Sequence, residues 1–131
     1  MSEPYPAFDW EPESVDCAVG ITGNGTGTPT RPTSSRNNYT LARTGVGAIT
    51  IKFQDDPGPT FQGIVGFGFQ DATPANGAGW SVVAGAYTAR SGATPAQLTV
   101  VTYNGSNAAA DMASTTTLSM LLSFKQAPGV E

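Results

Sequence analysis

VGAITIKF, residues 46–53, is the stretch of sequence that most clearly indicates the fold of this chain. Ile49, Ile51 and Phe53 alternate with a threonine and a lysine, so the apolar side chains fall on one side of an extended backbone. A repeat of two residues is typical of a β-strand that buries one face and exposes the other. The stretch therefore predicts a half-buried strand.

Six further stretches have the character of strands, and segments rich in glycine, proline, asparagine and aspartate separate them, as expected for turns. The last stretch places Leu118, Met120, Leu122 and Phe124 on one face. Glycines at positions 63, 66 and 68 predict a bulge or a close approach of another backbone. The six stretches cover residues 17–22, 38–43, 61–70, 80–89, 96–103 and 117–125.

The composition also favours strands over helices. Charged residues make up only 12% of the chain, about half the usual share, and small polar residues take their place. We find no convincing amphipathic helix, so we expect an all-β fold: an antiparallel β-sandwich, or a jelly-roll-like fold, of about seven strands. The sandwich is expected over residues 17–125, an extended N-terminal arm over 1–16, and a short C-terminal tail over 126–131.

The negative charge is concentrated at the N-terminus. Residues 1–16 hold five of the 10 acidic residues and none of the six basic ones, so the remaining residues carry five acids and six bases. A nucleic-acid partner would require a basic stripe, which this sequence lacks. An acidic segment instead suits a basic protein surface.

The N-terminal segment MSEPYPAFDWEPESVD combines three aromatic residues with three prolines. Proline fixes its own backbone angle and pushes the preceding residue toward an extended conformation, which predicts an extended arm. The aromatic residues would anchor this arm on a partner, although a disordered leader or packing on its own domain remain alternatives. The predicted partner-binding residues of the arm are Tyr5, Phe8, Trp10, Glu11 and Glu13.

A second candidate binding segment is the long loop over residues 23–38, which is rich in glycine, threonine, proline and asparagine. Loops of this length are usually functional or mobile. Its basic residues Arg31 and Arg36 either contact an acidic neighbour or lie in a solvated loop, and the sequence does not favour one interpretation over the other.

The sequence lacks the constellations on which most enzymes depend. It has no histidine and one cysteine, Cys17, which excludes histidine-based triads and cysteine-rich zinc sites and suits a small buried apolar residue. Asp55 and Asp56 are best explained as turn residues before a proline, although a calcium site there is conceivable. We therefore expect no enzyme activity and no cofactor. The absence of a signal peptide and of a long apolar run predicts cytoplasmic synthesis and no membrane partner.

The stretches TGVGAITIKF and QLTVVTYNGSNAAADMASTTTLSMLLSF resemble small virion proteins of tailed bacteriophages. In that family a G-x-Y/I-T-I-x-F strand precedes a V-x-T-Y/F-x-x-x-G-x-x-A-D stretch and a closing strand of the type T-x-x-V-x-L-x-F. The resemblance spans roughly residues 43–125. It implies a β-sandwich on the outside of a phage head that acts as a decoration (cement) protein, with the major capsid protein as partner and a homotrimer as the self-associated state.

Two functions are therefore weighed. The first is a structural virion protein on the capsid exterior that binds and stabilises the head. The alternative is a carbohydrate-binding or adhesion module of a head fibre or tail, for which Trp80, Tyr87 and Tyr103 would form a sugar-stacking platform. Core packing is the preferred interpretation of Trp80, because an apolar strand sequence follows it directly.

Overall fold

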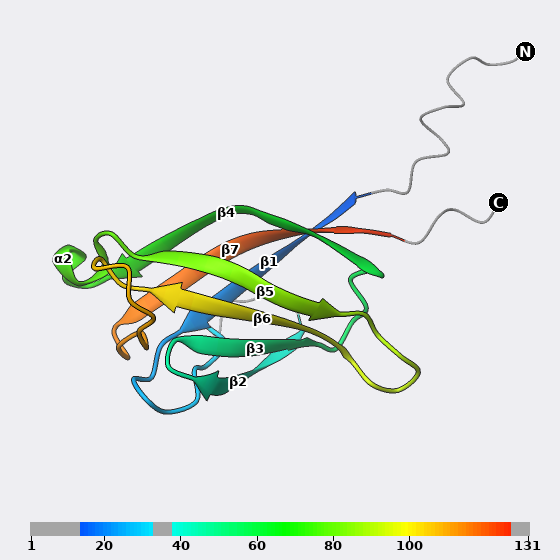
Figure 1. The fold of residues 1–131 in the computed structure, drawn as a ribbon, viewed down its shortest axis with the longest axis horizontal. Helices are drawn as coiled ribbons and strands as arrows, with labels where there is room; N and C mark the ends of the chain where they lie inside the picture. The colour runs from blue at the N-terminus through cyan, green and yellow to red at the C-terminus, as the bar shows by residue number, and fades with distance from the viewer. Residues whose placement is uncertain (1–13, 33–37, 127–131) are drawn as a thin grey trace, which may run out of the picture.

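A computed structural model of the chain describes residues 14–32 and 38–126, and it is an antiparallel sandwich of two sheets (Figure 1). One sheet has the order β1-β7-β4 and the other has the order β2-β3-β6-β5. This arrangement confirms the predicted all-β fold of about seven strands. The elements are β1 (Ser14–Thr22), β2 (Tyr39–Gly45), β3 (Ala48–Phe53), β4 (Thr60–Asp71), α2 (Pro74–Gly77), β5 (Ser81–Thr88), β6 (Ala96–Tyr103) and β7 (Thr116–Lys125).

The first strand begins earlier than the sequence suggested. β1 starts at Ser14 rather than at residue 17, because its backbone continues to pair with β7 up to the pair Ser14–Lys125. The sequence contains no proline between residues 13 and 28 that would remove a donor from this ladder. Residues 14–16, which were predicted to be part of the arm, therefore belong to the sheet.

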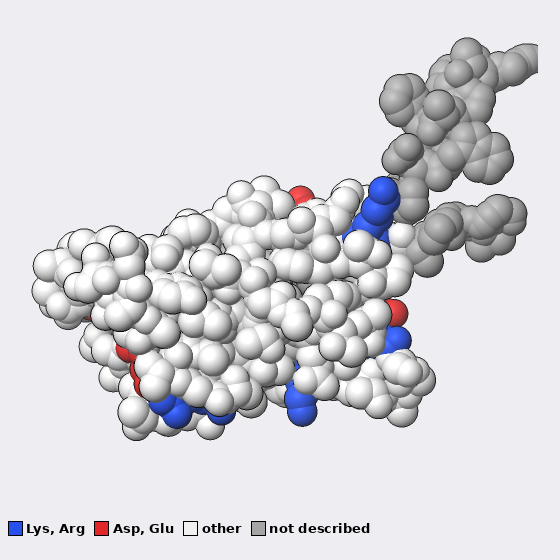
Figure 2. All heavy atoms as spheres, in the orientation of Figure 1, with Lys and Arg blue, Asp and Glu red and all other residues white. Residues whose placement is uncertain are grey.

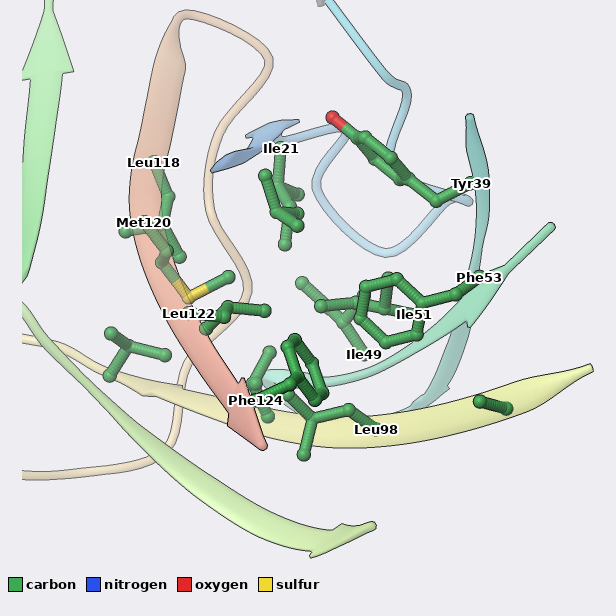
Figure 3. Close-up of a cluster of buried hydrophobic side chains, with 14 of the residues drawn as sticks. Ile21, Tyr39, Ile49, Ile51, Phe53, Leu98, Leu118, Met120, Leu122 and Phe124 are labelled. Carbon is green, nitrogen blue, oxygen red and sulfur yellow. The ribbon is translucent and has the colours of Figure 1, made fainter. Parts of the chain in front are cut away.

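The buried core lies between the two sheets and consists of alternating side chains (Figure 3). Ile49, Ile51 and Phe53 of β3 are at most 5% exposed, which confirms the alternation predicted from the sequence. The residues on β7 face them from the opposite sheet: Leu118, Met120, Leu122 and Phe124 are each at most 3% exposed. Figure 3 also labels Ile21, Tyr39 and Leu98, which belong to the same core and are at most 2% exposed.

β4 departs from regular strand geometry where its glycines predicted a bulge. Its pairing with β7 shifts between Phe61 and Gly63 and again between Ile64 and Gly66. Gly63 has a φ of 141°, a conformation that other residues rarely adopt. The extra residue at the second bulge, Val65, is 61% exposed, whereas Ile64 packs against the core. The bulges thus reset which side chains of β4 face inward.

One carboxylate is part of the interior. Asp71, at the end of β4, is 9% exposed and accepts hydrogen bonds from the hydroxyl groups of Thr116 (2.6 Å) and Thr115 (2.9 Å). It also accepts one from the backbone N–H of Thr73, at 2.8 Å. These donors, the Thr116 hydroxyl first, lower the pKa of Asp71 despite the opposing effect of burial. Asp71 therefore ties the end of β4 to the start of β7 and to the turn that leads into α2.

Replacing Leu122 with alanine should lower the free energy of unfolding by about 3 kcal/mol, because it leaves a cavity in a fully buried position. The neighbouring Leu121→Ala is a matched control, since Leu121 points outward and is 36% exposed. Urea denaturation at neutral pH measures both values. An equal loss of unfolding free energy in the two variants would contradict the assignment of Leu122 to the inner face of β7 and of Leu121 to the outer face.

Asp71 should also make the stability of the protein depend on pH. A carboxyl group whose pKa is lower in the folded state stabilises the fold above the pKa of the unfolded chain, which is about 4. That contribution is lost as the pH falls through the folded-state pKa. We expect Asp71→Asn to be less stable than the wild type at pH 7, and the difference to shrink in acid. Denaturation curves between about pH 7 and pH 2 test this, with Asp55→Asn in an exposed turn as the control.

Candidate partner-binding site

Most of the partner-binding residues predicted from the sequence lie outside the residues that the structure describes. The exception is Arg31, whose Nη1 donates to Oδ1 of Asn38 at 3.4 Å and whose guanidinium lies 5.4 Å from the centre of the Tyr39 ring. Arg31 thus contacts its own chain at the start of β2, and its contact with a partner stays a prediction. The residues outside the described ranges are Tyr5, Phe8, Trp10, Glu11, Glu13 and Arg36.

The structure shows where the N-terminal segment joins the body. Ser14 pairs with Lys125, and Lys125 pairs on its other side with Thr60, so the junction lies at one end of the three-stranded sheet. The Ser14 hydroxyl donates to Oε1 of Gln62 at 3.0 Å across β7. We call this end of the sandwich, where β1 and β4 begin and β7 ends, the junction end. Figure 1 shows the start of β1 beside the end of β7 there.

A cleft of about 150 Å³ opens at the junction end, and we call it the acid-lined cleft. Apolar atoms of Val15, Phe53 and Pro57 lie beside three aspartates, and no lysine or arginine lines it. Its volume is below the 300–1,000 Å³ or so that is typical of small-molecule sites, so it suits one side chain of a partner better than a whole ligand. The lining residues are Val15, Asp16, Cys17, Asn38, Phe53, Asp55, Asp56 and Pro57.

The aspartates of this cleft are the exposed carboxylates of the described residues. Asp16, Asp55 and Asp56 are all exposed, and none has a lysine or arginine within ion-pair distance among those residues. The other two described acids are engaged: Asp71 is buried, and Asp111 forms an ion pair with Arg43 at 2.8 Å. Carboxylates without an ion-pair partner in the described chain therefore gather at the end of the body that continues into the acidic segment.

The turn between β3 and β4 forms one wall of the cleft and is held in place by several hydrogen bonds. The Tyr87 hydroxyl donates to the carbonyl oxygen of Gly58 at 2.6 Å, and the backbone N–H of Gly58 donates to Oδ1 of Asp56 at 3.0 Å. The side-chain amide of Gln126 donates to the carbonyl oxygen of Pro57 at 3.1 Å. Burial, together with the charge of Asp56, raises the pKa of Tyr87 to about 12, so this donor keeps its proton at neutral pH.

The thiol and the carboxylates of the cleft form neither a reactive nucleophile nor a metal-binding group. Cys17 is partly buried against the core, and burial raises the pKa of its thiol, which makes it a poorer nucleophile. Among the residues that the structure describes, no three histidine, cysteine, aspartate or glutamate side chains are grouped to hold a metal ion. With three exposed aspartates and no lysine or arginine in its lining, the cleft has the chemistry to bind a cationic side chain.

At the opposite end of the sandwich, Arg43 and Asp111 form an ion pair. Nε and Nη2 of Arg43 donate to the two carboxylate oxygens of Asp111 at 2.9 and 2.8 Å, and the backbone N–H of Gly47 donates to Oδ1 at 2.9 Å. The hydrogen bonds from Arg43 are the main cause of the lowered pKa of Asp111. An adjoining cavity of about 10 Å³ holds no more than one water molecule.

The three aromatic residues considered for a sugar-stacking platform do not form a row. Trp80 and Tyr87 pack against the core, and the Trp80 ring lies 5.9 Å from the ring of Phe69, which confirms the prediction of core packing for Trp80. Every second residue of β6 is buried and faces the core, and the last of these is Thr102. Tyr103 is the next residue, so its side chain lies on the outer face of the sheet. The arrangement offers no flat aromatic surface to a sugar.

From the sequence, Asp55 and Asp56 were predicted to be turn residues and Asp16 to be part of the arm. A site shared by the three carboxylates was therefore not predicted. Asp16 lies far from the other two in the sequence, and only the position of β1 relative to the β3–β4 turn brings all three to one cleft. The sequence did contain one signal, namely that each of these acids lies close to the end of a predicted strand.

Comparisons with known proteins give no relative. No protein-family model matches the chain, no curated protein matches it, and no solved structure matches its fold significantly. Within the described residues, no helix has the length and apolar character needed to cross a membrane.

Replacing Tyr87 with phenylalanine should destabilise the fold by about 1 kcal/mol, because the Gly58 carbonyl loses its hydrogen bond. Since the pKa of Tyr87 is raised in the folded state, its stabilisation is complete below about pH 10 and is lost as the pH rises toward 12. Urea denaturation from neutral pH upward should therefore show the difference from the wild type shrinking in alkali.

The matched control is Tyr103→Phe, on the outer face of β6. No hydrogen bond joins the Tyr103 hydroxyl to another of the described residues, so its removal should leave the stability nearly unchanged. A difference between wild type and Tyr87→Phe that stays constant into alkali would contradict the role assigned to the Tyr87 hydroxyl.

Proposed function

We propose that this chain is a structural virion protein that decorates the outside of a tailed-phage head and stabilises it. The observation that carries the proposal is the gathering of exposed carboxylates at the junction end, where the acidic and aromatic residues 1–13 join the body. The resemblance of the strand motifs to small virion proteins supports the same function, as does the two-sheet sandwich that this resemblance implies.

The proposed partner is the major capsid protein, through a basic surface. The acid-lined cleft accepts a lysine or arginine side chain, with its methylene groups against Val15 and Phe53 and its charge toward the aspartates. Exposed ion pairs contribute little each, so the aromatic residues Tyr5, Phe8 and Trp10 supply most of the binding energy in this proposal. The acidic groups then determine orientation and the rate of association.

A repeating shell makes such modest contacts effective. Capsid lattices present the same site many times, and copies that contact each other as well as the shell bind by avidity. A small sandwich that is fixed at one end is suited to binding such a lattice, because its close-packed sheets provide a rigid body. The adhesion alternative has no support from the aromatic arrangement, because Trp80 and Tyr87 are packed inward.

The direct test is co-sedimentation with expanded heads of the phage that carries this protein. The wild type should bind, and deletion of residues 2–13 should abolish binding while leaving the body folded. The deletion stops at residue 13 because Ser14 is already part of β1. A truncated protein that binds as well as the wild type would overturn the role of the segment, and a wild type that does not bind would overturn the function.

The contribution of the cleft is tested separately with a charge-matched pair of variants. Asp16→Asn/Asp55→Asn removes two negative charges from the cleft and should weaken binding about tenfold, equivalent to about 1.4 kcal/mol. Thr26→Lys/Ser106→Lys adds two positive charges at exposed positions near the opposite end and should leave the affinity unchanged. Equal effects of the two double variants would show that only the net charge matters.

A further inference from the structure

The outer face of the β1-β7-β4 sheet carries short side chains around an exposed leucine. The odd-numbered residues of β7 point to this face, because the even-numbered ones are buried in the core. In the pairing register, Leu121 lies between Ala18 of β1 and Gly66 of β4, so neither neighbour covers it and it is 36% exposed. We call this surface the Leu121 face; it consists of Ala18 and Gly20 of β1, Ser119 and Leu121 of β7, and Gly66 and Gly68 of β4.

The Leu121 face is open on its β4 side within the described part of the chain. A Cβ atom added to Gly66 or Gly68 would meet no atom within 4 Å, and the side chains of Ala18 and Ser119 are exposed. The solvent face of an antiparallel sheet normally carries polar side chains along every strand. Here the backbone of β4 and the side chain of Leu121 lack such a cover.

Two charged residues, Asp16 and Lys125, lie on the outer face of this sheet, and both are near the junction end. Asp16 pairs with Ser123, and Lys125 pairs with Ser14. In Figure 2 few coloured atoms lie along the upper side of the molecule, where Figure 1 places β4 and β7. Among the described residues Lys125 has no ion-pair partner, so a cation is available where residue 13 enters β1.

The N-terminal segment has the alternation of a strand that needs cover on one face. From residue 4 to residue 12 every even-numbered residue is apolar, whereas the four acids of residues 1–13 are all odd-numbered. A repeat of two residues gives an extended chain one apolar and one polar face. The apolar residues are Pro4, Pro6, Phe8, Trp10 and Pro12, and the acids are Glu3, Asp9, Glu11 and Glu13.

A straight continuation of β1 would not bury this apolar face. β1 turns odd-numbered residues such as Val15 and Cys17 toward the core, so even-numbered residues upstream of it would point away from the core. β7, on which β1 pairs, also ends at Lys125, opposite Ser14. The apolar face of the segment therefore needs a surface other than the sandwich core.

We propose that residues 4–10 fold back over the outer face of their own sheet and cover the Leu121 face. Residues 11–13 supply the reversal, since residue 13 joins Ser14 at the margin of that face. Residues 4–10 span about 23 Å when extended, and their even-numbered members recur at the same two-residue spacing as the rows of the sheet. Phe8 and Trp10 then lie over Leu121 and the glycines of β4, whose exposed backbone an aromatic ring can cover.

Connection and charge favour this segment as the occupant. A segment that is tethered at the margin of a surface has an effective concentration there on the order of millimolar, so a modest contact suffices. The reversal places Glu11 and Glu13 beside Lys125, and the other acids of the segment point to solvent. The three prolines restrict the undocked chain and so lower the entropic cost of ordering the segment.

The inference concerns the free protein and does not rest on the proposed capsid function. The apolar face of the segment cannot contact the sheet and a shell at the same time. A shell that captures Phe8 and Trp10 would therefore have to bind them more tightly than the Leu121 face does. Because the test uses the purified protein alone, its outcome is separate from that of the co-sedimentation with heads.

Trp10 reports this contact once the other tryptophan is removed. The chain has two tryptophans, and Trp80→Phe leaves Trp10 as the single one while keeping a ring beside Phe69. Acrylamide quenching of Trp10 fluorescence is measured in the full chain and in a peptide of residues 1–13. We expect the quenching constant in the full chain to be at least about threefold lower, since a docked state that predominates shields the indole.

A charge-matched pair of variants, made in the Trp80→Phe background, locates the contact. Leu121→Asp places a charge under the apolar side of the segment and should return the quenching of Trp10 to the value in the peptide. Val83→Asp adds the same charge at a valine that is 54% exposed on the outer face of the other sheet, and it should leave Trp10 protected. Circular dichroism confirms that both variants are folded.

Three results would overturn the proposal. The first is a full chain in which Trp10 is quenched as strongly as in the peptide. The second is an equal effect of Leu121→Asp and Val83→Asp on the quenching. The third is a protection of Trp10 that increases with protein concentration, because this would assign the cover to a neighbouring copy rather than to the chain's own sheet.

Discussion

The contact of the Phe124 ring with three others links both sheets of the sandwich. Its centre lies 5.4 Å from that of Phe53 on β3, 5.3 Å from that of Phe61 on β4, and 5.4 Å from that of Tyr87 on β5. Phe53 also lines the acid-lined cleft, and Tyr87 holds the turn that forms its wall. The shape of the candidate binding end is thus a direct extension of core packing, which is why a binding site built from loops and strand ends can be rigid.

The exposed carboxylates of the described residues are gathered at one end of the body. Carboxylates that face solvent are found at the junction end, while the carboxylates elsewhere in the described residues are buried or paired. The side formed by β4, α2 and β5 carries none. These two surfaces of the body therefore differ in charge and in position.

The features of the fold that depend on local periodicity could be predicted from the sequence. The alternation of Ile49, Ile51 and Phe53 identified a strand and its inner face, and β6 was predicted with the bounds that the structure shows. Glycine at position 63 predicted the bulge, because its special conformation is a property of the residue itself. These features follow from neighbours in the sequence and need no knowledge of the tertiary fold.

The features that were not predicted from the sequence depend on contacts between segments that lie far apart along the chain. Asp71 looked like an isolated acid, yet hydroxyls from Thr115 and Thr116 bind it. Tyr87 was considered as a surface aromatic, but β5 turns it toward Phe124. The start of β1 was predicted too late, because strand pairing with β7 rather than local propensity decides how far a strand extends. In each case, the structure differs from the prediction because a residue far along the chain determines the conformation or the burial of the residue in question.

The pairing of the first described strand with the last has a consequence for how the protein forms. β7 lies between β1 and β4, so neither of its neighbours in that sheet has its partner until β7 itself has been synthesised. Closing so long a loop is slow, and the apolar faces of β1 and β4 stay uncovered meanwhile. The second sheet is built from two hairpins, β2–β3 and β5–β6, which can pair while the ribosome is still adding residues. Folding is therefore expected to finish only once β7 has left the ribosome, with the three-stranded sheet assembling on a preformed four-stranded one.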